Sequence, residues 1–78
     1  MENRRINGWD FEFVSQDEGN DEFYQCRGEV VYDDDHDEQP EPSLLSAAYH
    51  LAQRLEKSGV KCEVGASEKG WVEVQLLN

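Results

Sequence analysis

Residues 43–59, SLLSAAYHLAQRLEKSG, give the strongest structural signal in the chain, because their apolar residues recur with the period of an α-helix. Seven apolar side chains share one broad face: Leu44, Leu45, Ala47, Ala48, Leu51, Ala52 and Leu55. Ser43 is a suitable N-cap residue, and Gly59 suits the position just after the last turn. The sequence therefore predicts one helix that begins at Ser43 and needs a sheet to cover its apolar face.

Two strands are predicted after this helix. Residues 60–64, VKCEV, alternate between apolar and charged side chains, which is the period of a strand with one buried face. The segment 66–70, ASEKG, has the composition of a hairpin loop. Residues 71–77, WVEVQLL, alternate again, which places Val72, Val74 and Leu76 toward the core and Trp71 toward solvent.

Two further strands are predicted before the helix. Residues 9–13, WDFEF, alternate with Asp10 and Glu12 on the outer side, and residues 15–20 suit a hairpin loop. Residues 22–32 read as the second strand, with Tyr24 and Cys26 inward. Gly28 within it marks either a bulge or the close approach of another backbone.

Residues 33–42 separate these strands from the helix and are rich in acids. Pro40 and Pro42 flank a single residue, which excludes the interior of a helix or of a central strand. We therefore expect residues 33–42 to form an extended, solvated acidic loop.

The expected order is ββαββ within a single domain, residues 1–78. The predicted fold class is α+β, with a four-stranded, mainly antiparallel sheet and one helix packed on one face. The other face of the sheet would be solvated. If the strand 71–77 lies at the sheet edge, it offers a site for self-association, so either a monomer or a homodimer is expected.

The charge is unevenly distributed. The net charge is −11, and residues 6–53 contain thirteen acids and one base, whereas residues 54–78 contain four of each. This acidity argues against direct binding to nucleic acid or to an anionic membrane. The sequence contains no apolar run of transmembrane length and no signal-peptide core, so a cytoplasmic protein is expected.

No catalytic motif is present, so we expect a protein that is not an enzyme and that needs no cofactor. Asp33, Asp35 and Asp37 have the spacing that begins an EF-hand loop, but Glu38 stands where that loop needs glycine. No specific metal site is therefore expected. Cys26 and Cys62 are expected to be reduced and buried, although a bridge between neighbouring strands is also possible geometrically.

Two explanations of the acidity remain. Negative charge keeps small proteins soluble, but solubility alone requires less of it, and self-repulsion destabilises the compact state. The alternative is that the acids recognise the basic surface of a nucleic-acid-binding protein, because twelve charges equal those along about 20 Å of duplex DNA. The candidate partner-binding residues are Asp10, Glu12, Asp17, Glu18, Asp21, Glu22, Glu29, Asp33, Asp34, Asp35, Asp37 and, as an aromatic anchor, Trp71.

The acid-rich stretches DFEFVSQDEGNDE, residues 10–22, and VYDDDHDEQPEP, residues 31–42, support a resemblance. In their acidity, the short chain and the hairpin–helix–hairpin plan, the protein resembles the small phage-encoded inhibitors of host defence, which include DNA-mimic and anti-CRISPR proteins. The resemblance covers composition and plan and involves no motif. It implies an inhibitor of a CRISPR effector or another nucleic-acid enzyme, acting in the cytoplasm of the host cell. An antitoxin or immunity protein against a basic nuclease, or an acidic interaction module, would have the same surface.

Overall fold

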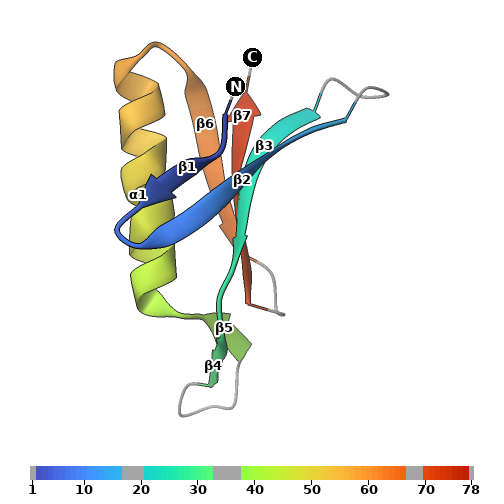
Figure 1. Ribbon diagram of the computed structural model, residues 1–78, viewed down its shortest axis with the longest axis vertical. Coiled ribbons are helices and arrows are strands. Elements are labelled where there is room, and N and C mark those ends of the chain that lie inside the picture. Colours follow the sequence, from blue (N-terminus) through green and yellow to red (C-terminus); the bar gives the residue numbers. More distant parts are fainter. Residues whose placement is uncertain (1, 17–20, 33–37, 67–69, 78) are drawn as a thin grey trace.

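The computed structural model describes residues 2–16, 21–32, 38–66 and 70–77. It shows an α+β fold in which one helix packs against one face of an open, antiparallel sheet of five strands (Figure 1). A separate two-stranded ladder lies at one end of the longest dimension, which measures 38 Å. The prediction of an α+β protein with one helix and a mainly antiparallel sheet is confirmed, whereas the prediction of four strands in the order ββαββ is wrong.

The elements follow the chain in the order β1, β2, β3, β4, β5, α1, β6, β7. Their bounds are β1 Arg4–Ile6, β2 Trp9–Gln16, β3 Asp21–Arg27, β4 Val30–Tyr32, β5 Glu38–Pro40, α1 Pro42–Lys57, β6 Lys61–Ala66 and β7 Trp71–Leu77. The strand order in the large sheet is β1-β2-β3-β7-β6, and β4 pairs with β5. The order places β7 inside the sheet, between β3 and β6, so the condition for self-association through this strand, a position at the sheet edge, is not met.

The fifth strand, β1, results from a tight turn at Asn7-Gly8. Both residues have positive φ, 51° for Asn7 and 86° for Gly8, and Ile6 pairs with Trp9 across the turn. Two central residues with positive φ give the twist that antiparallel strands need, and Asn-Gly is the pair that adopts this conformation most easily. This local signal was sufficient to predict the hairpin and was missed, because β1 has only three residues and no alternation of its own.

The predicted strand 22–32 is interrupted at Gly28, and the reason is the close approach of two other segments. A Cβ atom at Gly28 would lie 2.8 Å from the Leu44 side chain, and its N–H donates a 3.0 Å hydrogen bond to the Gly70 carbonyl. Beyond Gly28 the chain leaves the sheet and forms β4.

The expectation that residues 33–42 form a loop is wrong for Glu38–Pro40, which pairs with β4. Pro40 is tolerated there because it lies in a two-stranded ladder, where one side of each strand needs no partner.

The helix begins one residue earlier than predicted, with Pro42 in its first turn and Glu41 as the N-cap. Ser43 does not cap the backbone, and its hydroxyl donates a 2.8 Å hydrogen bond to the Glu41 carboxylate instead. The predicted C-terminal end is confirmed: Gly59 has φ 86°. Its N–H donates to the Glu56 carbonyl and the Val60 N–H to the Leu55 carbonyl, the paired bonds of a glycine-terminated helix.

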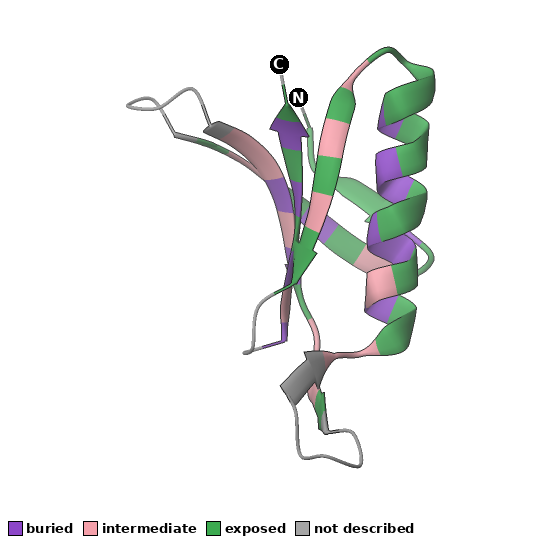
Figure 2. Ribbon diagram, turned by 180° about the vertical axis from the view of Figure 1, so that it is seen from behind, coloured by how far each residue is buried: buried purple, intermediate pink, exposed green. Residues whose placement is uncertain are grey.

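The core lies between α1 and the sheet, as Figure 2 shows by the buried residues on the facing sides of these two layers. The buried hydrophobic residues among those described are Ile6, Phe11, Tyr24, Cys26, Leu44, Ala47, Ala48, Leu51, Ala52, Leu55, Val72, Val74 and Leu76. All of the inward positions predicted for 71–77 belong to this set. No helix of the described ranges has both the length and the apolar character required to cross a bilayer.

Candidate partner-binding surface

The sheet face that points away from α1 is called the open face. Alternation along each strand assigns its members, and the strand register places them beside one another. It consists of Arg5, Asp10, Glu12, Val14, Phe23, Gln25, Arg27, Lys61, Glu63, Gly65, Trp71, Glu73, Gln75 and Leu77. The prediction that Asp10, Glu12 and Trp71 point outward is therefore confirmed.

Three exposed carboxylates, those of Glu12, Glu73 and Glu63, form a row across the strands of the open face. Glu12 pairs with Gln25, which pairs with Glu73 on β7, so the Glu12 and Glu73 backbones are two strand spacings, or about 10 Å, apart. Glu63 lies on the next strand, opposite Gln75, about 8 Å from Glu73 along the diagonal. None of these carboxylates has an ion-pair partner among the side chains that the structure describes. The row can therefore meet cationic groups of a partner.

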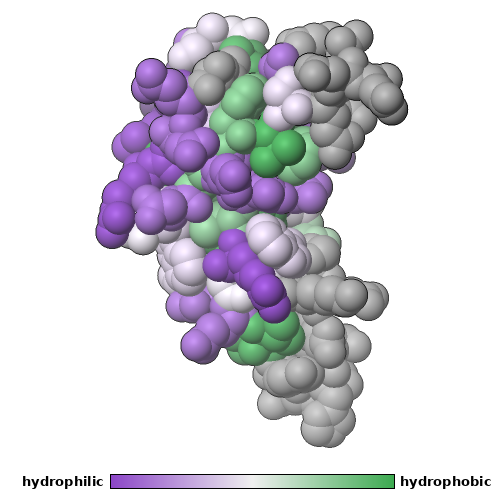
Figure 3. All heavy atoms as spheres, turned by 45° about the vertical axis from the view of Figure 1, so that its right-hand side comes forward, coloured by the Kyte–Doolittle hydropathy of each residue, from purple (hydrophilic) through white to green (hydrophobic). Residues whose placement is uncertain are grey.

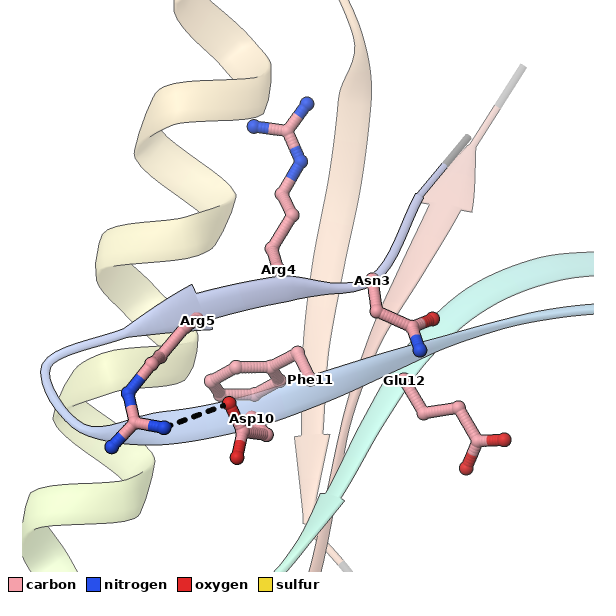
Figure 4. Close-up of a pocket in the computed structure, with 6 residues that line it drawn as sticks. All are labelled: Asn3, Arg4, Arg5, Asp10, Phe11 and Glu12. Carbon is pink, nitrogen blue, oxygen red and sulfur yellow. Dashed lines mark hydrogen bonds and ion pairs between the residues drawn. The ribbon is translucent and has the colours of Figure 1, made fainter.

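Basic side chains interrupt the acidity at one end of the open face. Figure 4 shows Arg5 and Asp10 pointing toward each other, and their charged atoms are 3.5 Å apart. They line a shallow pocket of about 450 Å³ together with Asn3, Arg4, Phe11 and Glu12. The Arg4 side chain points away from Asp10, and its Nε–H donates a 3.3 Å hydrogen bond to the Tyr24 hydroxyl. Asp10 is thus partly neutralised, whereas Glu12 is not.

The aromatic residue predicted as an anchor is partly covered. Trp71 is half-buried, and the Arg27 guanidinium lies 5.7 Å from the centroid of its ring. A cation over an aromatic face at such a position contributes about 0.5–1 kcal/mol.

Val14 and Phe23, which pair directly across β2 and β3, add a second half-buried apolar group on the same face. Figure 3, which brings forward the side of the molecule away from α1, shows hydrophobic residues next to hydrophilic ones. A protein–protein interface is about as apolar as the rest of a protein surface, so this mixture is compatible with an interface.

The other predicted site residues do not lie together on the open face. Glu22, the first residue of the predicted strand 22–32, lies in β3 on the side that bears Tyr24, so it does not belong to the open face. Glu29, expected on the open face, is exposed in the connection between β3 and β4. Asp21 belongs to β3 by its backbone. Asp17, Glu18, Asp33, Asp34, Asp35 and Asp37 lie outside the described residues. Glu63 and Glu73 were missed as candidates, although strand alternation alone places both on the outer face of the sheet with Glu12.

The two acid-rich stretches are attached at distant points of the fold. The β2–β3 ladder ends with Gln16 opposite Asp21, and the β4–β5 ladder ends with Tyr32 opposite Glu38. Figure 1 shows that these ladder ends point to opposite ends of the molecule. Over the 38 Å length of the molecule, the net charge of −11 is about half that of duplex DNA of the same length.

Both cysteines are free thiols, as expected for a reduced pair. Cys26 is buried and Cys62 is half-buried, and β7 lies between their strands, which excludes a bridge between neighbouring strands. Burial raises the pKa of the Cys26 thiol, and the negative charge of Asp10 raises it further, against a smaller opposing effect of a backbone hydrogen bond. Burial and then Glu56 raise the pKa of Cys62. Both thiols are therefore poor nucleophiles in the folded protein.

These thiols predict how stability depends on pH. A thiol whose pKa is higher in the folded state holds its proton longer there, so the unfolded state releases its proton first as the pH rises through the ordinary value of 9.0. The free energy of unfolding is expected to fall between about pH 8 and pH 10. Urea unfolding across this range measures the fall, and the Cys26→Ala/Cys62→Ala variant is expected to show a shallower one. An equal slope in both proteins would contradict the assignment to the thiols.

No group of three or more His, Cys, Asp or Glu side chains suited to a metal ion occurs in the described part of the chain. His50 is exposed on α1, and the EF-hand-like residues Asp33, Asp35 and Asp37 lie outside that part. No protein-family model matches the chain, and neither a curated protein nor a solved structure gives a significant match.

Proposed function

We propose that this protein is a non-enzymatic inhibitor that binds the basic site of a nucleic-acid-binding protein through its acidic surface. The observation that carries the proposal is the excess of carboxylates that the fold leaves uncompensated. The described ranges contain eleven acids and six bases, and the only ion pair seen between described side chains is Arg5–Asp10. Keeping so many unpaired acids on a small domain costs stability through self-repulsion, which is expected only where the charge serves another purpose.

The open face provides the geometry for such binding. Glu12, Glu73 and Glu63 form a row that meets lysine and arginine side chains, while Phe23 and Val14 provide apolar contact beside it. Charged groups speed the encounter with a basic partner, and half-buried aromatic groups near the centre of an interface contribute most of the lasting affinity. The acid-rich segments 17–22 and 33–41 add charge to the field that steers the partner.

The target class within this proposal rests on the resemblance in composition. It favours a CRISPR effector or another nucleic-acid enzyme of a host cell, which places the inhibitor in the host cytoplasm. The mixture of apolar, acidic and basic groups on the open face also favours a second candidate, an acidic interaction module that binds a protein without imitating DNA. An antitoxin against a basic nuclease would use the same surface and differ only in its target.

Capture from host lysate separates these candidates. The immobilised protein is incubated at low salt, at about 0.5 M NaCl, and with duplex DNA as a competitor. We expect capture of a nucleic-acid enzyme that salt weakens and DNA displaces, and loss of nucleic-acid binding by that enzyme in a gel-shift assay when the protein is added. Capture without displacement by DNA would favour the interaction module, and no specific capture at either salt concentration would contradict both candidates.

A pair of variants with equal charge tests whether the row on the open face is the site. Glu12→Gln/Glu73→Gln and Glu2→Gln/Glu56→Gln each remove two exposed carboxylates, the first pair from the row and the second from elsewhere. The first variant is expected to weaken binding to the captured enzyme about tenfold or more at low salt, and the second less than about threefold. Equal losses would show that net charge alone matters. Replacing Asp33, Asp34, Asp35 and Asp37 by Asn would then show whether that segment takes part.

A further inference from the structure

We propose that a second copy of this chain pairs antiparallel with the outer edge of β6, which joins two sheets into one continuous ten-stranded sheet. The inference rests on the sheet order and on the charges of β6, of which Glu63 also belongs to the row on the open face. Its test measures self-association of the purified chain without any partner, so its failure is distinguishable from failure of the proposed function.

The two edges of the large sheet differ. The β1 edge is three residues long and carries Arg4 and Arg5, and short charged edges resist pairing with other chains. The β6 edge is six residues long, with the sequence KCEVGA, and contains neither proline nor a run of like charge. No described strand pairs with its outer side. An edge of this length and composition is the kind to which another strand adds.

The distribution of charge selects the same edge for a second copy. Residues 54–78, which include β6, β7 and the end of α1, contain four acids and four bases. Residues 6–53 carry a charge of −12 and include the strands on the other side of the sheet. Two copies that approach through β6 therefore meet at their neutral parts and keep their acidic parts apart, whereas pairing through β1 would bring the acidic parts together.

Charge complementarity also selects a register. If both helices lie on the same face of the joined sheet, opposed residues must point to the same side, so only every second register is allowed. With Cys62 opposite its own copy, Lys61 of each chain lies opposite Glu63 of the other, which gives two opposite-charge pairs. The neighbouring allowed registers place Lys61 opposite Lys61, or Glu63 opposite Glu63. A further shift that centres Val64 leaves Glu63 opposite Gly65, without a charge partner.

Exposed apolar groups lie on both sides of this edge. Leu77, 42 % exposed, pairs with Lys61 on the open-face side. It also lines a pocket of about 470 Å³ with Glu56, Gly59, Val60, Lys61 and Cys62. Tyr49, 53 % exposed, lies two helical turns before Glu56 on the same flank of α1. They are two of the three exposed large hydrophobics in the described ranges. A second copy added to β6 would extend the sheet beside these two groups.

Sedimentation of the purified full chain from about 1 µM to about 1 mM tests the proposal. We expect a concentration-dependent dimer. Glu63→Lys turns both cross-strand pairs into lysine pairs and is expected to raise the dimer Kd about tenfold or more, although it lowers the net charge that repels the two copies. Lys61→Glu is expected to act in the same direction. The double swap Lys61→Glu/Glu63→Lys restores the complementary pairs and is expected to restore the dimer.

The single variants and the double swap are compared at equal folded fraction by circular dichroism, so a loss of folding is not mistaken for a loss of pairing. A monomer at every concentration would overturn the proposal. The β6 register would be overturned if neither single substitution raised the dimer Kd, or if the double swap failed to restore the dimer.

Discussion

Gly70→Ala is expected to lower the free energy of unfolding by about 3 kcal/mol, for two reasons that act together. Gly70 has φ 78°, in the left-handed region where a Cβ atom is strained. A Cβ atom there would also lie 2.7 Å from the Gly28 carbonyl oxygen, and this neighbour is backbone that cannot turn aside. The two segments must separate, which weakens the 3.0 Å hydrogen bond from the Gly28 N–H to the Gly70 carbonyl.

Gly59→Ala provides the matched control. Gly59 has φ 86°, but nothing lies within 4 Å of a Cβ atom built on it, so only the conformational strain remains. Its expected cost is about 1 kcal/mol. Urea unfolding followed by tryptophan fluorescence measures both variants. If the two glycines cost the same, the close approach of the Gly28 and Gly70 backbones does not contribute, and the contact between β3 and the start of β7 is looser than the structure shows.

Leu51→Ala is expected to lower the free energy of unfolding by about 2–5 kcal/mol, because it leaves a cavity between α1 and the sheet. Leu51 is 0 % exposed and lies in the middle of the helix face that packs on the sheet. A chain of 78 residues has a total stability of about 4–12 kcal/mol. The substitution therefore removes a large share of it, and a substantial unfolded fraction is expected near 37 °C.

Leu45→Ala, in the same helix, controls for the change from leucine to alanine. Leu45 is only partly buried at the margin of the core, so less apolar area and a smaller cavity are involved. Its expected cost is below about 1.5 kcal/mol. Chemical denaturation of both variants gives the comparison. Equal costs would mean that the neighbours of Leu51 move in and fill the cavity, and that the core between α1 and the sheet is not closely packed.

The periodicities of the sequence predicted the elements that carry the core. The apolar stripe of residues 44–55 and the alternation in residues 9–13 and 71–77 were sufficient, because each of these patterns repeats several times within one segment. The interruption of the strand at Gly28 was not predictable in the same way. It depends on Leu44 and Gly70, which are distant in the chain, and no local pattern reports where such neighbours lie. The pairing of Val30–Tyr32 with Glu38–Pro40 across an acidic segment has the same origin.

The candidate site was predictable to a similar extent. Alternation placed Asp10, Glu12 and Trp71 on the outer face, because a strand side chain has only two directions to choose between. The sequence could not show that Arg5 pairs with Asp10, that Arg27 covers Trp71, or that Glu63 and Glu73 continue the row from Glu12. Each of these contacts depends on which strands are neighbours.

Three features of this protein follow from its amino-acid pattern alone: the single helix, the face that each strand turns to the core, and the separation of an acidic part from a neutral part of the chain. The strand order, with β7 inside the sheet next to the edge strand β6, became known only from the folded structure, and it fixes which charges share a surface. The physical reason is that periodicity is a property of one segment, whereas strand order is set by the joint packing of several segments against α1. Side chains far apart in the sequence become neighbours only when that packing is complete.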